Sequence, residues 1–210
     1  MTHLVAGIFD IVVGSVMLLL FFRFMLQFAG VERSDPYAKS IYQLTKVVDV
    51  FSRIFPTLGG GRVSLSAVAL LFLLRLIFVW GVLDLMQLDS QNIGLFHSTD
   101  YNMAMIDHLH RYYSPFMLFF VASVTLVVDF LRLCQNLIIA SFVISWIVIF
   151  SDKVHPALLL LANLSEPLIS PFRKLLPVTG MFDLAPMVGF FLIILLEVIV
   201  KTFGVYLINL

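Results

Sequence analysis

The residues best suited to chemistry in this chain are ionisable side chains that lie inside long apolar stretches. Arg75 lies about halfway along the apolar run 64–85, and Glu197 lies about halfway along the run 184–207. A charge at the centre of a bilayer is costly unless it is paired or hydrated, so each of the two residues is a candidate functional site. We expect Arg75 and Glu197 to form an ion pair between two helices. The alternative partner of Glu197 is Lys201, which follows it by one helical turn.

The same charges have two functional interpretations. In one, Arg75, Glu197 and Asp129 line an ion path. In the other, they form a latch that holds two spans together. We favour the latch, because the runs 64–85 and 184–207 lack the matching helix interruptions that line the binding sites of many transporters.

Other constellations that could support catalysis are weak. His108 and His110, next to Asp107, supply too few ligands for a closed metal site. The single cysteine, Cys134, lies in an apolar stretch, and the chain contains no CxxC, GxSxG, HExxH or P-loop motif. The sequence therefore predicts no enzymatic activity, no metal and no cofactor.

The composition is that of an integral membrane protein. Of the 210 residues, 61% are hydrophobic and only 12% are charged, and the mean hydropathy is +1.05. Several windows of about 20 residues are long enough to cross a bilayer. A formal net charge of +0 without a basic run gives no indication of nucleic-acid binding.

The apolar runs predict an all-α membrane protein with about four spans, at 4–28, 64–85, 126–150 and 184–207. The run 115–150 is too long for one perpendicular crossing. It could hold two tightly connected spans, or one span at 126–150 preceded by an interfacial lead-in at 115–125.

Basic residues favour four spans over five. The polar elements 30–62 and 151–182 carry most of the Lys and Arg, whereas the connection 86–113 carries only Arg111. Basic loops tend to remain cytoplasmic. An even number of crossings then separates the two basic elements, and both termini lie outside. A five-span arrangement would place one basic element outside.

The two halves of the chain follow the same order of elements. We predict a first repeat at 1–85, a connection and lead-in at 86–125, and a second repeat at 126–210. Each repeat has two spans joined by a cytoplasmic interfacial amphipathic element, which in the first repeat is a helix at 38–55. Four residues of the first copy, Phe51, Arg53, Pro56 and Gly59, align with Phe172, Lys174, Pro177 and Gly180 of the second.

The second basic element is the strongest candidate for a lipid- or partner-binding site. Pro167 and Pro171 are predicted to prevent one regular helix and to form a kinked interfacial segment. Arg173 and Lys174 would then face anionic lipid head groups, and each would contribute about 1 kcal/mol of electrostatic attraction. The alternative is a membrane-anchored turn that only sets the angle between helices. Asp183 is predicted to cap the last span.

The run Glu-Pro-Leu-Ile-Ser-Pro-Phe-Arg-Lys-Leu-Leu-Pro at 166–177, followed by Gly180 and Phe-Asp-Leu-Ala-Pro-Met at 182–187, resembles the signature of the YggT family. The copy in the first half matches that signature less completely. The resemblance implies a small multi-pass protein of the bacterial inner membrane, from a family that also has plastid relatives and no established enzymatic activity. Family members are variously linked to osmotic-stress tolerance, division, nucleoid organisation and cytochrome assembly.

From this resemblance we expect a non-catalytic scaffold or assembly factor. The alternative is a small oligomeric channel or transporter subunit. The expected partners are anionic lipids of the bilayer, an unknown membrane protein and, through homo-oligomerisation, further copies of the chain.

Overall fold

The computed structural model describes residues 2–55, 57–58, 61–88, 100–150, 155–175 and 183–209. Almost all of these residues are helical, and one short antiparallel pair of strands, β1 (Thr57–Leu58) and β2 (Val63–Ser64), pairs Thr57 with Ser64. The helices are α1 (Thr2–Phe28), α2 (Pro36–Leu44), α3 (Val47–Phe51), α4 (Leu65–Leu88), α5 (Asp100–Arg111), α6 (Pro115–Phe150), α7 (Pro156–Leu175) and α8 (Ala185–Ile208).

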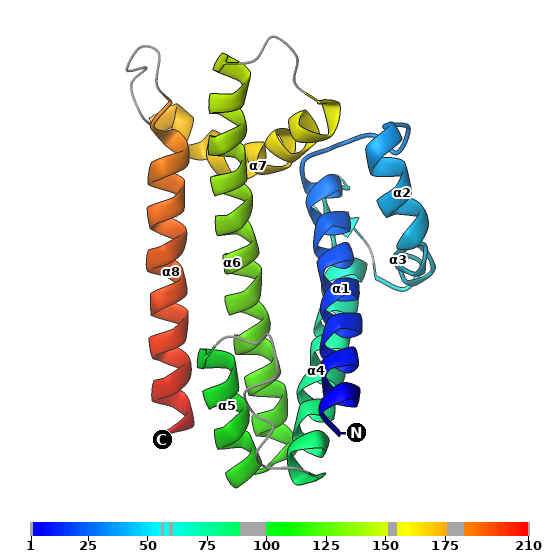
Figure 1. The fold of residues 1–210 in the computed structure, drawn as a ribbon, viewed down its shortest axis with the longest axis vertical. Coiled ribbons are helices and arrows are strands. Elements are labelled where there is room, and N and C mark those ends of the chain that lie inside the picture. Colours follow the sequence, from blue (N-terminus) through cyan, green and yellow to red (C-terminus); the bar gives the residue numbers. More distant parts are fainter. Residues whose placement is uncertain are drawn as a thin grey trace.

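Four of these helices, α1, α4, α6 and α8, are long and apolar enough to cross a membrane. The prediction of an all-α membrane protein with about four spans is confirmed. Both termini lie at one end of the molecule, and α7 lies at the opposite end (Figure 1). The division into two repeats, at 1–85 and 126–210, stays a prediction.

The apolar run 115–150 forms one continuous helix, α6, of 36 residues, or about 54 Å. One continuous helix excludes two tightly connected spans in this run. The division into a lead-in at 115–125 and a span at 126–150 stays a prediction. No glycine occurs in this run and no proline follows Pro115, so no residue ends the helix. Val121 and Ala122, in the supposed lead-in, are completely buried.

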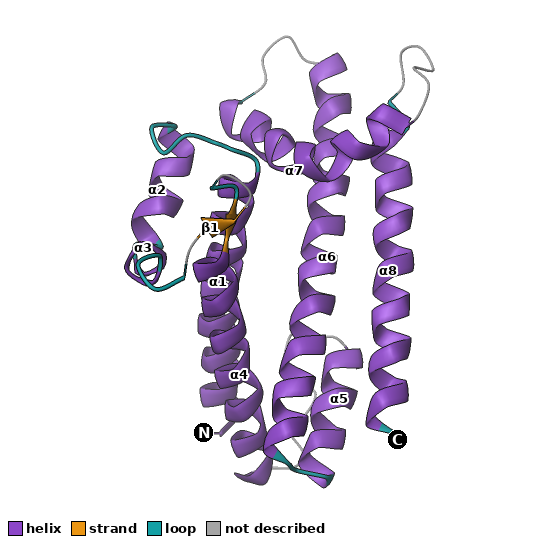
Figure 2. Cartoon of the chain, turned by 180° about the vertical axis from the view of Figure 1, so that it is seen from behind, coloured by secondary structure: helices purple, strands orange, loops and turns teal. Residues whose placement is uncertain are grey.

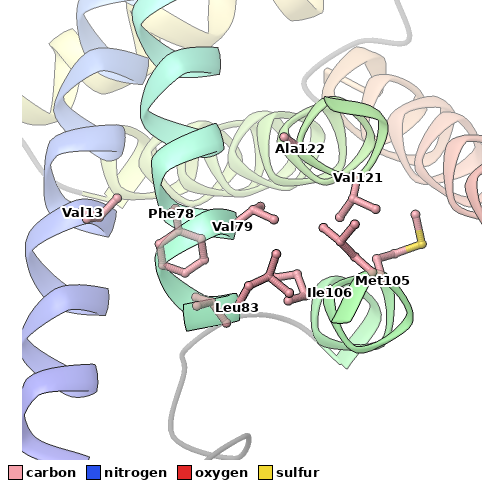
Figure 3. Close-up of a cluster of buried hydrophobic side chains, with 10 residues drawn as sticks. Val13, Phe78, Val79, Leu83, Met105, Ile106, Val121 and Ala122 are labelled. Carbon is pink, nitrogen blue, oxygen red and sulfur yellow. The ribbon is translucent and has the colours of Figure 1, made fainter. Parts of the chain in front are cut away.

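The connection before α6 contains a helix that the sequence reasoning missed. In α5, Met105, Ile106 and Leu109 recur at helical spacing and are buried. They pack with residues of α1, α4 and α6, including Val13 and Phe78 (Figure 3). This core fixes α5 against the spans at the end of the molecule where the termini lie.

The first basic element forms two short helices rather than the single helix predicted at 38–55. Pro36 begins α2, and the Asp35 carboxylate accepts the N–H groups of Tyr37 and Ala38. The hydroxyl of Thr45 donates to the Ile41 carbonyl, 2.6 Å away, at the point where α2 ends. A side-chain bond to that carbonyl competes with the helical ladder.

The second basic element, α7, is one helix that lies across α6, roughly perpendicular to the spans (Figure 2). The prediction that Pro167 and Pro171 exclude a single helix is wrong, because both prolines lie inside α7. Each proline removes one backbone hydrogen bond, but Leu164 and Ile169 on the inner face of α7 are buried. Tertiary packing thus offsets the lost hydrogen bonds.

Candidate functional site

Arg75 on α4 is bound to the middle of α6. Its Nη1 lies 2.9 Å from Oδ2 of Asp129, and its Nε donates to the Thr125 hydroxyl at 3.0 Å. The guanidinium also lies over the Phe78 ring, 5.1 Å from the centroid. Only 4% of the Arg75 side chain is exposed, so this pair compensates a charge that is almost completely buried.

Asp129 also receives a hydrogen bond from α5. The Asn102 side-chain amide donates to Oδ1 of Asp129 at 2.7 Å. One carboxylate therefore connects α4 and α5 to α6.

Glu197 on α8 binds a second group of side chains on α6. Its Oε1 lies 2.8 Å from Nε of Arg132, and its Oε2 accepts from the Gln135 amide at 2.6 Å. Lys201, one turn further along α8, pairs with the same carboxylate. The side chains of Arg132 and Gln135 thus hold α8 against α6.

The predicted ion pair between Arg75 and Glu197 is wrong. α6 packs against both α4 and α8, and it supplies a separate counter-charge to each of the two residues. The alternative partner of Glu197, Lys201, is present. Asp129, Arg132 and Asn136 recur at three- and four-residue spacing and share one face of α6, a signal that the sequence reasoning did not use.

A groove of about 550 Å³ adjoins the Arg75 pair. Its lining comes from α1, α4, α5 and α6, and it carries carboxylates, guanidinium groups and amides besides apolar side chains. The lining residues are Asp10, Ile11, Gly14, Ser15, Met17, Leu18, Arg75, Phe78, Asn102, Asp129, Arg132, Leu133 and Asn136. Asp10, near the first end of the span in α1, is buried and lines this groove.

A further ion-pair cluster lies at the other end of α1. Arg23 is 1% exposed, and its Nη2 lies 2.6 Å from Oδ1 of Asp49, which also pairs with Arg33 at 3.2 Å. The Arg23 guanidinium lies 4.1 Å from the centroid of the Tyr42 ring. Burial raises the pKa of Tyr42. This cluster ties α2 and α3 to the end of α1, and the sequence reasoning did not predict it.

The predicted lipid-binding element contains a clamp centred on Arg173. Its Nη1 donates to Glu166 at 2.6 Å, and its Nε donates to Asp183 at 2.8 Å. Burial acts to lower the pKa of Arg173, but hydrogen bonds to Glu166 and Asp183 outweigh it and raise that pKa. Arg173 thus links the end of α7 to the start of α8.

The remaining residues predicted for this site fall in different places. Asp183 Oδ1 accepts the N–H of Ala185 at 2.9 Å, which satisfies a donor in the first turn of α8. Lys174 is exposed. Pro177 and Gly180 lie outside the described residues. Lipid binding by these residues stays a prediction.

The histidines expected to be a poor metal site lie on a helix. His108 and His110 are both in α5, and the His108 ring lies 5.0 Å from that of Tyr112. Among the described residues, no group of three or more His, Cys, Asp or Glu side chains is arranged to hold a metal ion.

The fold and its buried ion pairs define a multi-pass α-helical membrane protein. The CCB3/YggT family model matches residues 2–83 and 117–204, so this chain belongs to that family. The resemblance inferred from residues 166–187 is confirmed.

A relative from Pseudomonas aeruginosa (strain PAO1), described as uncharacterized protein PA0392, is 28% identical over 189 residues. The alignment covers 89% of this chain and 83% of the relative. No solved structure matches this chain.

Proposed function

We propose that this chain is a non-catalytic scaffold or assembly factor of the bacterial inner membrane. The observation that carries the proposal is the fixed connection of three spans through buried charges. Arg75 and Asp129 join α4 to α6, and Arg132 and Glu197 join α6 to α8. Such pairs hold spans in one arrangement, which suits a surface on which other membrane proteins assemble.

An exposed apolar face on α8 supports the same proposal. In α8, only 11% of the most apolar window is buried inside the chain, and large side chains such as Phe191 and Phe203 are exposed. This face can contact lipid, a partner span or another copy of the chain. Family membership supports a link to envelope, division or osmotic-stress physiology.

Cross-linking in intact membranes followed by purification tests the scaffold. We expect a partner in fixed stoichiometry with the chain. Replacement of Phe191 and Phe203 by Ala should reduce its recovery. A matched pair of changes at Phe116 and Phe119, which are also exposed but lie on α6, should leave recovery unchanged. Purification of the chain without any stoichiometric partner would contradict the scaffold.

The groove gives a specific reason to consider a second function. Charged side chains of α1, α4 and α6 line it, and a second copy that closed it would create a polar path for a channel or transporter subunit. Ion flux through purified protein in liposomes, lost on Arg75→Met, would support this function. It would overturn the scaffold as the main activity.

A further inference from the structure

The groove beside Arg75 is open along the sides of two parallel spans. α1 and α6 supply its walls, and α4 supplies Arg75 and Phe78. Ile11 and Leu18, which line the α1 side, are 63% and 41% exposed. Because these exposed side chains belong to a membrane span, the groove has an apolar edge that faces the bilayer. A ligand can therefore enter from the lipid phase.

Arg75, which lines the groove, has a buried hydrogen-bond donor without a protein acceptor. Arg75 uses Nη1 and Nε for Asp129 and Thr125, whereas its Nη2 has no partner among the described residues. A buried donor left without an acceptor destabilises the structure. A ligand oxygen at this position would satisfy Nη2, and a phosphate oxygen would do so most strongly.

The charges that line the groove balance. Asp10 and Asp129 are the carboxylates of the lining, and Arg75 and Arg132 are its cations. Arg132 is also paired with Glu197, which Lys201 pairs with in turn, so the formal charges of the whole group sum to zero. Asp10 and Arg75 both belong to the lining, so a negative and a positive group lie in the same groove. A ligand with both charges and no net charge matches this lining, because it adds no uncompensated charge within the membrane.

We propose that this groove binds the head group of a zwitterionic phospholipid. The phosphate accepts from Arg75, the ammonium group lies towards Asp10, and the acyl chains pass between α1 and α6 into the bilayer. A volume of about 550 Å³ lies in the range of small-molecule sites. The proposal does not depend on the scaffold function, since a bound lipid is compatible with a scaffold and with a channel.

Filling the groove tests the proposal without removing a charge. A Cβ built on Gly14 meets no atom within 4 Å, and the same holds for Gly7 two turns earlier. Gly14 lines the groove, whereas Gly7 is not part of its lining. Gly14→Leu is therefore the test variant and Gly7→Leu is the matched control. Ser15→Phe is a second variant that fills the same groove.

The experiment uses the full-length protein in nanodiscs that contain a photoactivatable phosphatidylethanolamine, with its diazirine near the glycerol backbone. We expect labelled peptides from residues 10–18 and 129–136. Labelling should fall about tenfold in Gly14→Leu and Ser15→Phe, which corresponds to about 1.4 kcal/mol of binding. Gly7→Leu should label like the natural chain. Thermal unfolding of each variant confirms that it is folded.

Two further probes distinguish head-group recognition from simple lipid contact. A photoactivatable diacylglycerol lacks the phosphate and the amine, and a phosphatidylglycerol carries a net negative charge. Both should label the groove more weakly than phosphatidylethanolamine. Equal labelling by diacylglycerol, or equal labelling of the natural chain and both filled variants, would overturn the proposal. Preferential labelling by phosphatidylglycerol would overturn the zwitterion and indicate an anionic-lipid site.

Discussion

At the scale of single residues, the intramembrane charges on α4 and α8 depend on side chains that α6 provides. Arg75 is compensated by Asp129, and Glu197 by Arg132 and Gln135. The desolvation cost of each charge is offset by its ion pair and by additional hydrogen bonds. Loss of one partner should therefore cost more than loss of the whole pair.

This asymmetry predicts the behaviour of two variants. Asp129→Asn should lower the free energy of unfolding by about 3 kcal/mol, because it leaves the buried Arg75 guanidinium without its main counter-charge. The double variant Arg75→Met, Asp129→Leu should recover part of this loss. Reversible unfolding in mixed micelles measures the free energy of unfolding of both variants.

The control for this prediction is Asp107→Asn. It removes the exposed pair between Asp107 and Arg111 on α5 and should change stability by less than about 1 kcal/mol. An Asp129→Asn protein as stable as this control would show that the buried pair does not hold the spans.

The two basic residues of α7 differ in how free they are to bind anionic lipid. Arg173 already pairs with Glu166 and Asp183, whereas Lys174 is exposed. Lys174→Ala should weaken binding of phosphatidylglycerol by about 1 kcal/mol, and Arg173→Ala should weaken it less. Native mass spectrometry of lipid adducts measures the affinity of both variants for phosphatidylglycerol. A larger loss of affinity in Arg173→Ala would reverse this ranking.

At the scale of elements, α7 and α8 approach each other closely at one glycine. A Cβ placed on Gly189 would lie 3.0 Å from the Phe172 ring, and Phe172 packs with Ile138, Ile169 and Ala185 in one cluster. The clamp of Arg173 on Asp183 joins the same two helices. A side chain at position 189 should therefore separate α7 from α8.

Gly189→Ala should destabilise the protein by about 1–3 kcal/mol through overpacking. Gly14→Ala should leave stability unchanged or slightly higher, because that position is open and Ala favours a helix. Adding Phe172→Leu to Gly189→Ala should restore part of the lost stability, because Leu is smaller than Phe. Equal unfolding midpoints of the two alanine variants would contradict the close contact.

At the scale of the whole molecule, four spans bring both termini to one end and α7 to the other. From the basic residues of α7 and of the element 30–62 we predict that the α7 end faces the cytoplasm. In that orientation, α5 and both termini are expected on the outside of the membrane.

Cysteine labelling checks this orientation, with spheroplasts exposing the outer face of the inner membrane and inverted vesicles exposing its cytoplasmic face. Cys134 is the single natural cysteine and is buried, so a membrane-impermeant maleimide should not label the natural chain. Tyr112→Cys, at an exposed position next to α5, should be labelled from outside in spheroplasts. Lys174→Cys should be labelled only in inverted vesicles, and the opposite pattern would reverse the topology.

The sequence by itself determined the class of protein, the approximate spans and the family. These properties depend on local composition and on contiguous residues, such as the apolar run 184–207 and the motif at 166–187. The helix start at Asp35 and Pro36 was predictable for the same reason, since a cap involves only neighbouring residues. The amphipathic spacing of Met105, Ile106 and Leu109 was also present, but the polar surroundings of α5 obscured it.

Only the tertiary structure decided which charges meet. Arg75 pairs with Asp129 rather than Glu197 because the pairing depends on which spans are neighbours and on how each helix is rotated about its axis. Neither property is encoded in the spacing along one helix. The same dependence explains why α7 stays helical through Pro167 and Pro171, since its buried face gains packing against α6 that a local reading cannot include.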